Sequence, residues 1–251
     1  LVPWFLRFIA ASRPSRLREL EAQGAALCLR ALDDTLDLLR ETGLSDQISE
    51  EGCVSLYADE AEFKADREHI EILDRFGFPH EVIERQAIKA LEPELSDKIG
   101  MAVRFPQNRS MKDPYKLVLA LVERFVALGG RIERGEVVGF TRSDRVREVV
   151  LRDGRKIPAD EVVICAGAFS AKLAQDLGEP IPLETERGYH TQIMAPGITM
   201  QHSIIWPAKA FMVTPTAGGI RVGGTVEMAG LEAAPDYRRA KVTVKRAKEA
   251  L

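Results

Sequence analysis

Residues 160–192 have the residue types of a ligand-binding turn. An apolar run over 162–164 leads to Ala166 and Gly167, and a helix is expected to begin near Phe169. A buried strand that ends in alanine and glycine brings its backbone close to a ligand, because no large side chain intervenes. This pattern is typical of contact with a flat or phosphate-bearing group.

Three polar residues near the end of this segment have the chemistry to contact a charged substrate. Arg187, Tyr189 and His190 open a predicted strand, and the forked guanidinium of an arginine there could bind a carboxylate. A salt bridge between Arg187 and Glu184 or Glu186 is the alternative. Because histidine titrates near neutral pH, His190 is a candidate general base, although single histidines more often have a structural role.

The sequence lacks the motifs of several other functional classes. The glycine-rich stretch 218–224 has neither the Gly-x-Gly-x-x-Gly spacing nor a following helix, so we interpret it as a tight hairpin. No Walker sequence and no Gly-x-Ser-x-Gly element is present. The four histidines are dispersed and no cysteines are grouped, so we expect no metal site.

Composition indicates a globular protein that does not bind nucleic acid. The 251 residues are 45% hydrophobic and 29% charged, with a net charge of -3, whereas a nucleic-acid-binding surface is usually basic. The three cysteines are far apart, and we expect them to be reduced and mostly buried. Residues 1–11 are apolar but too short to cross a bilayer. They could pack on the core of the protein or lie on a membrane surface.

Periodicity and turn signals predict the elements that position these residues. Apolar residues at three- and four-residue steps predict a long helix over 15–41, and Asp113-Pro114 begins a helix that stops at Gly129-Gly130. Asp153-Gly154 predicts a hairpin turn, and 161–165 a buried, fully apolar strand. The other predicted strands are 52–58, 99–105, 131–134, 136–142, 147–152, 183–194, 203–206, 211–214 and 219–226, with helices at 60–76, 84–91 and 236–251.

This order of elements predicts an α/β protein, α+β overall. It combines part of a doubly wound nucleotide-binding domain with an antiparallel-sheet domain. The predicted division is a helical segment over 1–51, part of a substrate domain over 52–112, part of the nucleotide-binding domain over 113–180 and an antiparallel substrate-binding domain over 181–251.

The ordered set of motifs resembles the FAD-dependent amino-acid oxidoreductases of the D-amino-acid oxidase superfamily, and the bacterial D-amino-acid dehydrogenases within it. The matching motifs are Asp113-Pro114 before its helix, Val137-Val138-Gly139, residues 160–170, Arg187-Gly188-Tyr189-His190, and residues 215–230. The last is similar to that family's Pro-x-x-x-Gly-(Leu/Ile)-Arg-(hydrophobic)-(Ala/Gly)-Gly-Thr-x-Glu pattern. The family's amino-terminal Gly-x-Gly-x-x-Gly and carboxy-terminal flavin segments have no counterpart here. We therefore expect a central portion of such an enzyme that purifies without bound FAD and is inactive by itself.

The resemblance implies roles for individual residues. Val137 matches the valine whose backbone contacts the FAD adenine, and Ala166 and Gly167 match small residues that lie against the cofactor. Phe211 or Met212 matches a tyrosine that lies near the amino acid in relatives. Without the hydroxyl, contact with an apolar substrate side chain or packing in the core is expected at that position.

The implied activity is oxidation of an amino acid, in which FAD takes a hydride from Cα and the imino acid hydrolyses to an oxo acid and ammonia. A secondary-amine oxidase acting on sarcosine, glycine or proline is one alternative. A non-catalytic binding or assembly domain with this fold is another. Oxygen or a membrane quinone would accept the electrons. We expect a cytoplasmic location. The apolar amino-terminal segment suggests an alternative, in which the protein is peripherally bound to the cytoplasmic face of the inner membrane.

Overall fold

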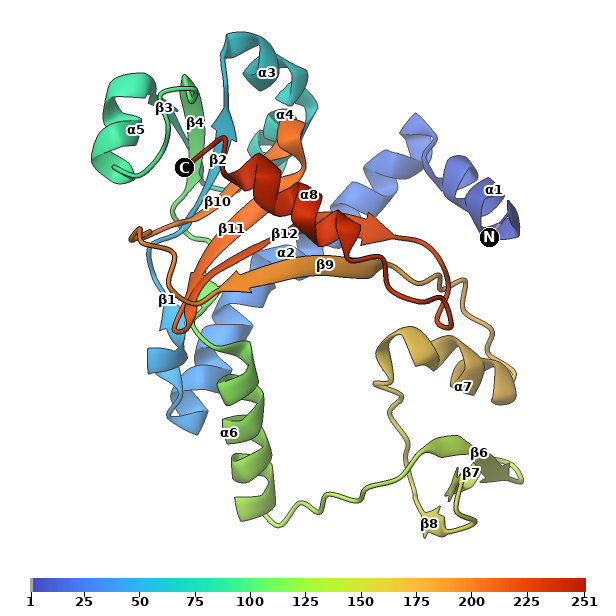
Figure 1. Ribbon diagram of the computed structural model, residues 1–251. Helices are drawn as coiled ribbons and strands as arrows, with labels where there is room; N and C mark the ends of the chain where they lie inside the picture. Colours follow the sequence, from blue (N-terminus) through green and yellow to red (C-terminus); the bar gives the residue numbers. More distant parts are fainter. Residues whose placement is uncertain (1) are drawn as a thin grey trace. The chain divides into compact units, whose positions relative to one another are not determined.

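The computed structural model describes residues 2–251 and confirms the mixed α/β class. The chain divides into two compact units (Figure 1). The smaller unit comprises the chain up to Ala10, residues 125–187 and residues 228–233. The larger unit comprises residues 11–124, 188–227 and 234–251.

A seven-stranded sheet with the order β3-β4-β2-β10-β11-β12-β9 forms the centre of the larger unit. β2 and β10 pair in parallel, whereas β3–β4, β2–β4, β10–β11 and β11–β12 are antiparallel pairs. A separate two-stranded ribbon joins β1 to β5. The strands are β1 (Ile48–Ser49), β2 (Cys53–Tyr57), β3 (Glu81–Glu84), β4 (Met101–Phe105), β5 (Ser110–Met111), β9 (Arg187–Ile193), β10 (Ser203–Trp206), β11 (Phe211–Thr216) and β12 (Gly219–Glu227).

The helices of the larger unit begin and end close to the predicted signals. Asp113 caps α6 by accepting hydrogen bonds from the backbone N–H groups of Tyr115 and Lys116, both at 3.1 Å. Gly43 ends the longest helix with a left-handed φ of 74°. The helices are α2 (Pro14–Thr42), α3 (Glu60–Ala65), α4 (Arg67–Phe76), α5 (Arg85–Leu91), α6 (Pro114–Ala127) and α8 (Arg238–Ala247), with short turns η1 (Ser45–Gln47) and η3 (Pro207–Lys209).

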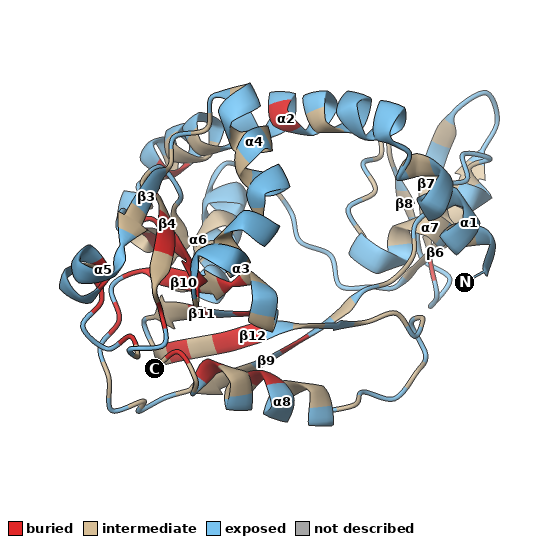
Figure 2. Cartoon of the chain, turned by 90° about the horizontal axis from the view of Figure 1, so that it is seen from above, coloured by how far each residue is buried: buried red, intermediate tan, exposed pale blue. Residues whose placement is uncertain are grey.

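The alternation of side chains along the central strands separates a core face of the sheet from a second face. A smaller buried cluster (Cys53, Tyr57, Val103 and Phe105) covers part of the second face, and we call the second face the open face because a cavity lies on the rest of it. Ile204, Trp206, Phe211, Val213 and Val222 are at most 2% exposed and belong to one cluster on the core face. In Figure 2 the buried residues concentrate on these strands and on the side of α8 that faces them. The residues between them in the sequence therefore face the opposite side of the sheet, where a ligand could bind.

Two adjacent glycines in β12 differ in what a side chain would meet. At Gly224, whose φ is +150°, an added Cβ would lie 2.4 Å from the Ala210 carbonyl oxygen. At Gly223 the nearest atom would be the His190 Cβ, at an ordinary 3.5 Å. We expect Gly224→Ala to lower the free energy of unfolding by about 2–3 kcal/mol, and Gly223→Ala to change it by less than about 1 kcal/mol. Urea unfolding of both variants measures the difference, and equal stabilities would contradict this account.

The smaller unit contains a three-stranded antiparallel sheet in the order β6-β7-β8. The turn at Asp153-Gly154 joins β7 to β8 as predicted, with Gly154 at φ 88°. The elements of this unit are α1 (Val2–Ala11), β6 (Val137–Arg142), β7 (Val146–Leu151), β8 (Lys156–Pro158), the turn η2 (Gly167–Phe169) and α7 (Ser170–Asp176).

Several local predictions were wrong. Residues 161–165 are not a strand and Val163 is 84% exposed. A strand of this kind needs neighbours on both edges, and the described residues contain no strand that pairs with it. Residues 131–134 are also not a strand, and β3 was not predicted as a strand because its sequence, Glu-Val-Ile-Glu, runs directly into α5.

The burial predicted for the cysteines also needs correction. Cys53 is buried, but Cys28 and Cys165 are exposed. Helix α1 has no fully buried residue, although Trp4 and Ala11 are partly buried. Within residues 2–251, no helix combines the length and apolarity that crossing a membrane requires.

Candidate functional site

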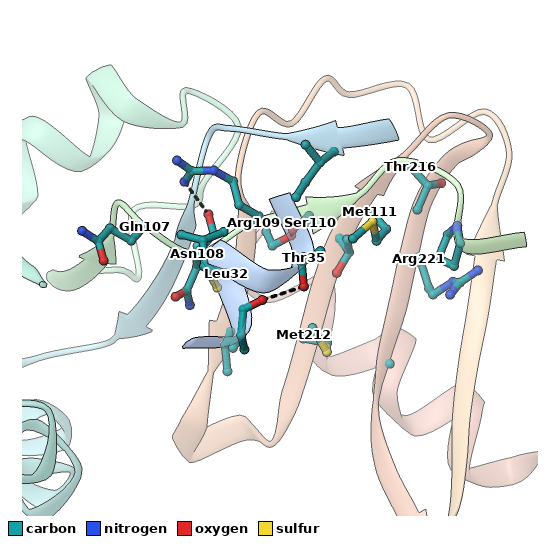
Figure 3. A pocket seen from close by; sticks show the side chains of 18 of the residues that line it. Leu32, Thr35, Gln107, Asn108, Arg109, Ser110, Met111, Met212, Thr216 and Arg221 are labelled. Carbon is teal, nitrogen blue, oxygen red and sulfur yellow. Dashed lines mark hydrogen bonds between the residues drawn. The ribbon is translucent and has the colours of Figure 1, made fainter. Parts of the chain in front are cut away.

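A cavity of about 710 Å³ lies on the open face of the large sheet (Figure 3). Its floor consists of side chains from β9, β10, β11 and β12, and its walls come from α2 and from the segment before β5. The lining residues are Cys28, Ala31, Leu32, Thr35, Ile48, Cys53, Gln107, Asn108, Arg109, Ser110, Met111, Pro114, His190, Ser203, Ile205, Met212, Thr214, Thr216, Arg221 and Gly223. None of them is acidic.

The pairing of β11 with β12 determines which side chains meet on the floor. Thr214 lies opposite Arg221, and Met212 lies opposite Gly223. Directly opposed residues of antiparallel strands have Cβ atoms within about 5.5 Å, so the two members of each pair share one patch of floor. A threonine hydroxyl beside a guanidinium forms a polar patch. The methionine beside a glycine forms an apolar patch with open space next to it.

Arg221 is the most informative residue of the cavity. Its Nε atom is buried and has no hydrogen-bond partner, and no acidic residue lines the cavity around it. Withdrawing a charge from water is costly unless an opposite charge or hydrogen bonds compensate for it. A partly buried guanidinium without a partner among the described residues is therefore suited to bind an anionic ligand, and a carboxylate fits its forked geometry.

The wall opposite the floor is held by specific contacts. The hydroxyls of Ser110 and Ser203 are hydrogen-bonded at 2.7 Å, which ties β5 to β10. In the β1–β5 ribbon, Ile48 pairs with Met111, and both side chains line the cavity. The segment before β5 also carries Arg109, whose Nη1 donates hydrogen bonds to the backbone carbonyls of Pro106 at 2.8 Å and Asn108 at 3.0 Å.

The other reactive groups of this cavity do not form a catalytic centre. Burial raises the pKa of the Cys53 thiol to about 11, so this cysteine stays protonated at neutral pH and is a poor nucleophile. The described residues contain no group of three His, Cys, Asp or Glu side chains that could hold a metal ion. The chemistry available here is therefore binding and orientation of an anionic molecule.

The structure places the four predicted substrate-contact residues of β9 and β11 on two different faces. His190 and Met212 line the cavity. Phe211 is 2% exposed and packs on Trp206 in the core, with ring centroids 6.1 Å apart. Tyr189 is 6% exposed, donates to Glu227 at 2.5 Å and accepts from the backbone N–H of Asp236 at 2.7 Å. Since adjacent strand residues point to opposite faces, only one member of each pair reaches the cavity.

Arg187 has a different position from the other candidates. It is the first residue of β9 and the last residue of segment 125–187 of the smaller unit, and it is partly buried. It lines neither this cavity nor the one in the smaller unit.

The predicted cofactor residues lie in the smaller unit, beside a cavity of about 990 Å³. Val137 and Ala166 line it, and Gly167 lies between two lining alanines. Arg152 makes a bidentate ion pair with Glu136 at one side of the cavity, which holds the pKa of Glu136 below its usual range. The complete lining is Gly135, Glu136, Val137, Val138, Arg152, Ala166, Ala168, Phe169, Ala171, Lys172, Leu173, Gln175, Leu183, Glu184, Thr185, Gly230, Leu231 and Glu232.

Two features of this cavity fit a flat ring system. Among the described residues β6 pairs with β7 and with no other strand, so one of its edges has no strand neighbour. Val138 forms a bulge, because the pairing advances two residues on β6 for one on β7. Gly167 has φ +54° and a Cβ there would have no heavy atom within 4 Å. No atom of the described residues fills the space beside Gly167, so a ligand could occupy that space.

Neither arginine of the cavity in the larger unit was singled out from the sequence as a binding residue. Arg221 lies within the stretch 218–224, which was interpreted as a hairpin, and within the family motif of residues 215–230, and Arg109 lies in a predicted loop. An arginine between glycines on a predicted strand could have indicated a binding residue from the sequence, because the glycines leave open space around a long cationic side chain.

Comparison with known proteins agrees with this fold. The chain is 29% identical over 246 residues to a D-amino-acid oxidase of Bradyrhizobium diazoefficiens, with 96% of this chain and 57% of that protein covered. It is 26% identical over 245 residues to a D-amino acid dehydrogenase of the same bacterium, covering 94% and 58%. The fold is similar to that of glycine oxidase from Bacillus cereus, with a TM-score of 0.75 and 22% identity over 96% of this chain and 65% of that one. This chain thus spans a little under two thirds of the length of each protein.

Residues 7–251, which are nearly the whole chain, match the model of a family described as FAD dependent oxidoreductase (DAO). This match includes both cavities and the strands that form them. The chain belongs to the DAO family of FAD-dependent oxidoreductases.

Proposed function

We propose that this chain is part of an enzyme that oxidises the Cα–N bond of an amino acid with FAD, in the manner of a D-amino-acid dehydrogenase. The observation that carries the proposal is the unpartnered guanidinium of Arg221 in a cavity without acidic residues. Every amino acid has a carboxylate, and an arginine in this setting binds a carboxylate well. The amino-acid oxidase and dehydrogenase among the relatives support the same substrate class.

The residues that line the cavity of the larger unit would bind and orient the substrate. Arg221 would hold the carboxylate, with the hydroxyl of Thr214 as a second donor from the opposite strand position. Met212 would contact the substrate side chain over the open space left by Gly223. His190, which also lines the cavity, would contact the substrate from β9. Fixing the carboxylate and the side chain restricts the orientation of Cα, which is the principal task of the protein in cofactor-driven oxidation.

The cofactor would be held in part by Val137, Ala166 and Gly167. The free edge of β6 at Val137 offers a backbone donor and acceptor, which suits the edge of an adenine ring, and the two small residues would allow close approach of a flat group. When bound, FAD supplies the two-electron oxidation, and the imino acid formed from the substrate hydrolyses to an oxo acid and ammonia.

The alternative within this class is an enzyme of the secondary-amine oxidase type, which would act on sarcosine, glycine or proline. Such substrates share the carboxylate, so Arg221 would serve equally, and the difference lies at the nitrogen. The similarity to glycine oxidase concerns the fold. We further propose that oxygen or a membrane quinone accepts the electrons. Any peripheral contact with a membrane would involve α1.

A substrate screen tests the proposed function. We expect the full-length, flavin-loaded protein to reduce an artificial electron acceptor with one or more D-amino acids and to release ammonia in equal amount. Turnover restricted to N-methyl or cyclic amino acids, with release of no ammonia, would favour the secondary-amine alternative. If the loaded protein oxidises no amino acid of either configuration and no N-substituted one, the proposal is wrong.

A further inference from the structure

The cavity of the larger unit contains a second arginine, Arg109, whose position is set before any ligand binds. Nη1 of Arg109 donates to two backbone carbonyls, of Pro106 and Asn108, and the adjacent Ser110 is tied to Ser203. Arg109 forms no salt bridge with any described acidic residue. A guanidinium has five N–H donors, and these two hydrogen bonds use only Nη1. The remaining donors of Arg109, which lines the cavity, have no hydrogen-bond partner among the described residues.

The two arginines give the cavity more positive charge than one ordinary amino acid can neutralise. Arg109 and Arg221 line the same space, and no aspartate or glutamate lines it with them. The carboxylate of a neutral amino acid would compensate one guanidinium, and its amino group would add no negative charge. A substrate with a second anionic group would compensate both arginines, and charge complementarity of this kind is a common source of specificity.

The space between the arginines includes apolar surface. In the view of Figure 3, Arg109 and Arg221 lie on opposite sides of the lining, and Met111 and Met212 lie between them together with Thr35 and Ser110. Flexible thioether side chains pack well against methylene groups of varying length. A molecule with a carboxylate at each end and methylene groups in the middle matches this order of cation, apolar surface and cation.

We infer that the substrate is an acidic amino acid whose main-chain carboxylate binds Arg221 and whose side-chain carboxylate binds Arg109. This inference rests on the proposed function and adds the substrate class to it. Arg109 is assigned as a specificity-determining residue, since it contacts the end of the substrate remote from Cα.

Matched acid and amide substrates give the most direct test. The flavin-loaded protein should oxidise glutamate, aspartate or 2-aminoadipate with a kcat/KM at least about tenfold above that of the neutral partner of the same shape, such as glutamine or asparagine. In Arg109→Gln the ratio of acid to amide should fall to near one. Arg85→Gln is the matched control, because Arg85 also donates to a backbone carbonyl, that of Asp97 at 2.7 Å, but does not line the cavity. Its ratio should equal that of the wild type.

A binding measurement without turnover separates this inference from the proposed function. Glutarate, which has two carboxylates and no amine, should raise the melting temperature of the protein more than butyrate does, and Arg109→Gln should remove the difference. If neutral amino acids are oxidised as well as acidic ones, the inference is wrong and the proposed function stands. If no amino acid is oxidised but glutarate still binds through Arg109, the proposed function is wrong and the dianion site is supported. Equal effects of glutarate and butyrate on the wild type would overturn the site itself.

Discussion

Replacing Arg221 by methionine should lower kcat/KM for amino-acid oxidation by about 100-fold or more. Methionine is similar in length to arginine but removes the charged donor that we assign to the substrate carboxylate. Loss of one partner from a buried, hydrogen-bonded charge pair costs about 2–5 kcal/mol, which corresponds to this range. The effect should be measured with the flavin-loaded protein as a change in both KM and kcat, because the carboxylate anchors the substrate before and during the reaction.

The same substitution should not destabilise the protein without substrate. Nε of Arg221 is buried without a hydrogen-bond partner, so removing the guanidinium relieves a desolvation cost. The melting temperature of Arg221→Met should equal or exceed that of the wild type. Arg238→Met serves as control, because Arg238 is exposed, pairs with Asp236 at 2.8 Å and does not line the cavity. A kcat/KM of Arg221→Met within about threefold of the control would contradict the assigned role.

Replacing Glu92 by alanine should lower the free energy of unfolding by about 3–5 kcal/mol. Glu92 is fully buried at the end of α5. Its Oε1 accepts hydrogen bonds from the backbone N–H of Gln201 at 2.8 Å, from the backbone N–H of His202 at 2.6 Å and from Nδ1 of His202 at 2.8 Å. Alanine would leave these buried groups without a partner and would disconnect α5 from the segment that leads into β10.

Two further variants make the stability prediction specific. Glu92→Gln retains an oxygen acceptor at the same position, so it should lose much less stability than Glu92→Ala. Glu94→Ala removes an exposed glutamate two residues away and should change stability by about 0.5 kcal/mol or less. Urea unfolding followed by circular dichroism measures all three. Glu92→Ala and Glu94→Ala with the same midpoint would show that the buried hydrogen bonds contribute little.

Elements with local signals were predicted well. The capping carboxylate of Asp113 and the glycines at 43 and 154 act within a few residues of the chain. The helix and turn positions that depend on them therefore follow from neighbouring residues. The apolar stretch 161–165 is the contrary case. Its composition is that of a buried strand, but strand formation requires hydrogen-bonding neighbours, and the described residues supply none for it.

The candidate site was predicted only in part, because strand periodicity leaves the face undetermined. The sequence pairs Tyr189-His190 and Phe211-Met212 indicated where a substrate contact could be, and each pair has one residue on each face of the sheet. Packing of Phe211 against Trp206 and the hydrogen bonds of Tyr189 decide which face is the core. His190 and Met212 are thereby directed to the cavity.

The sequence by itself determined the family resemblance, the α/β class and the local turns, since these depend on ordered motifs and on neighbouring residues. Only the tertiary structure decided that Arg109 and Arg221, which are far apart in the chain, line one cavity without an acidic residue. Their meeting depends on the pairing of β1 with β5, on the link between Ser110 and Ser203 and on the register of β11 with β12. Each of these contacts joins segments distant in sequence, so no local pattern of residues specifies them.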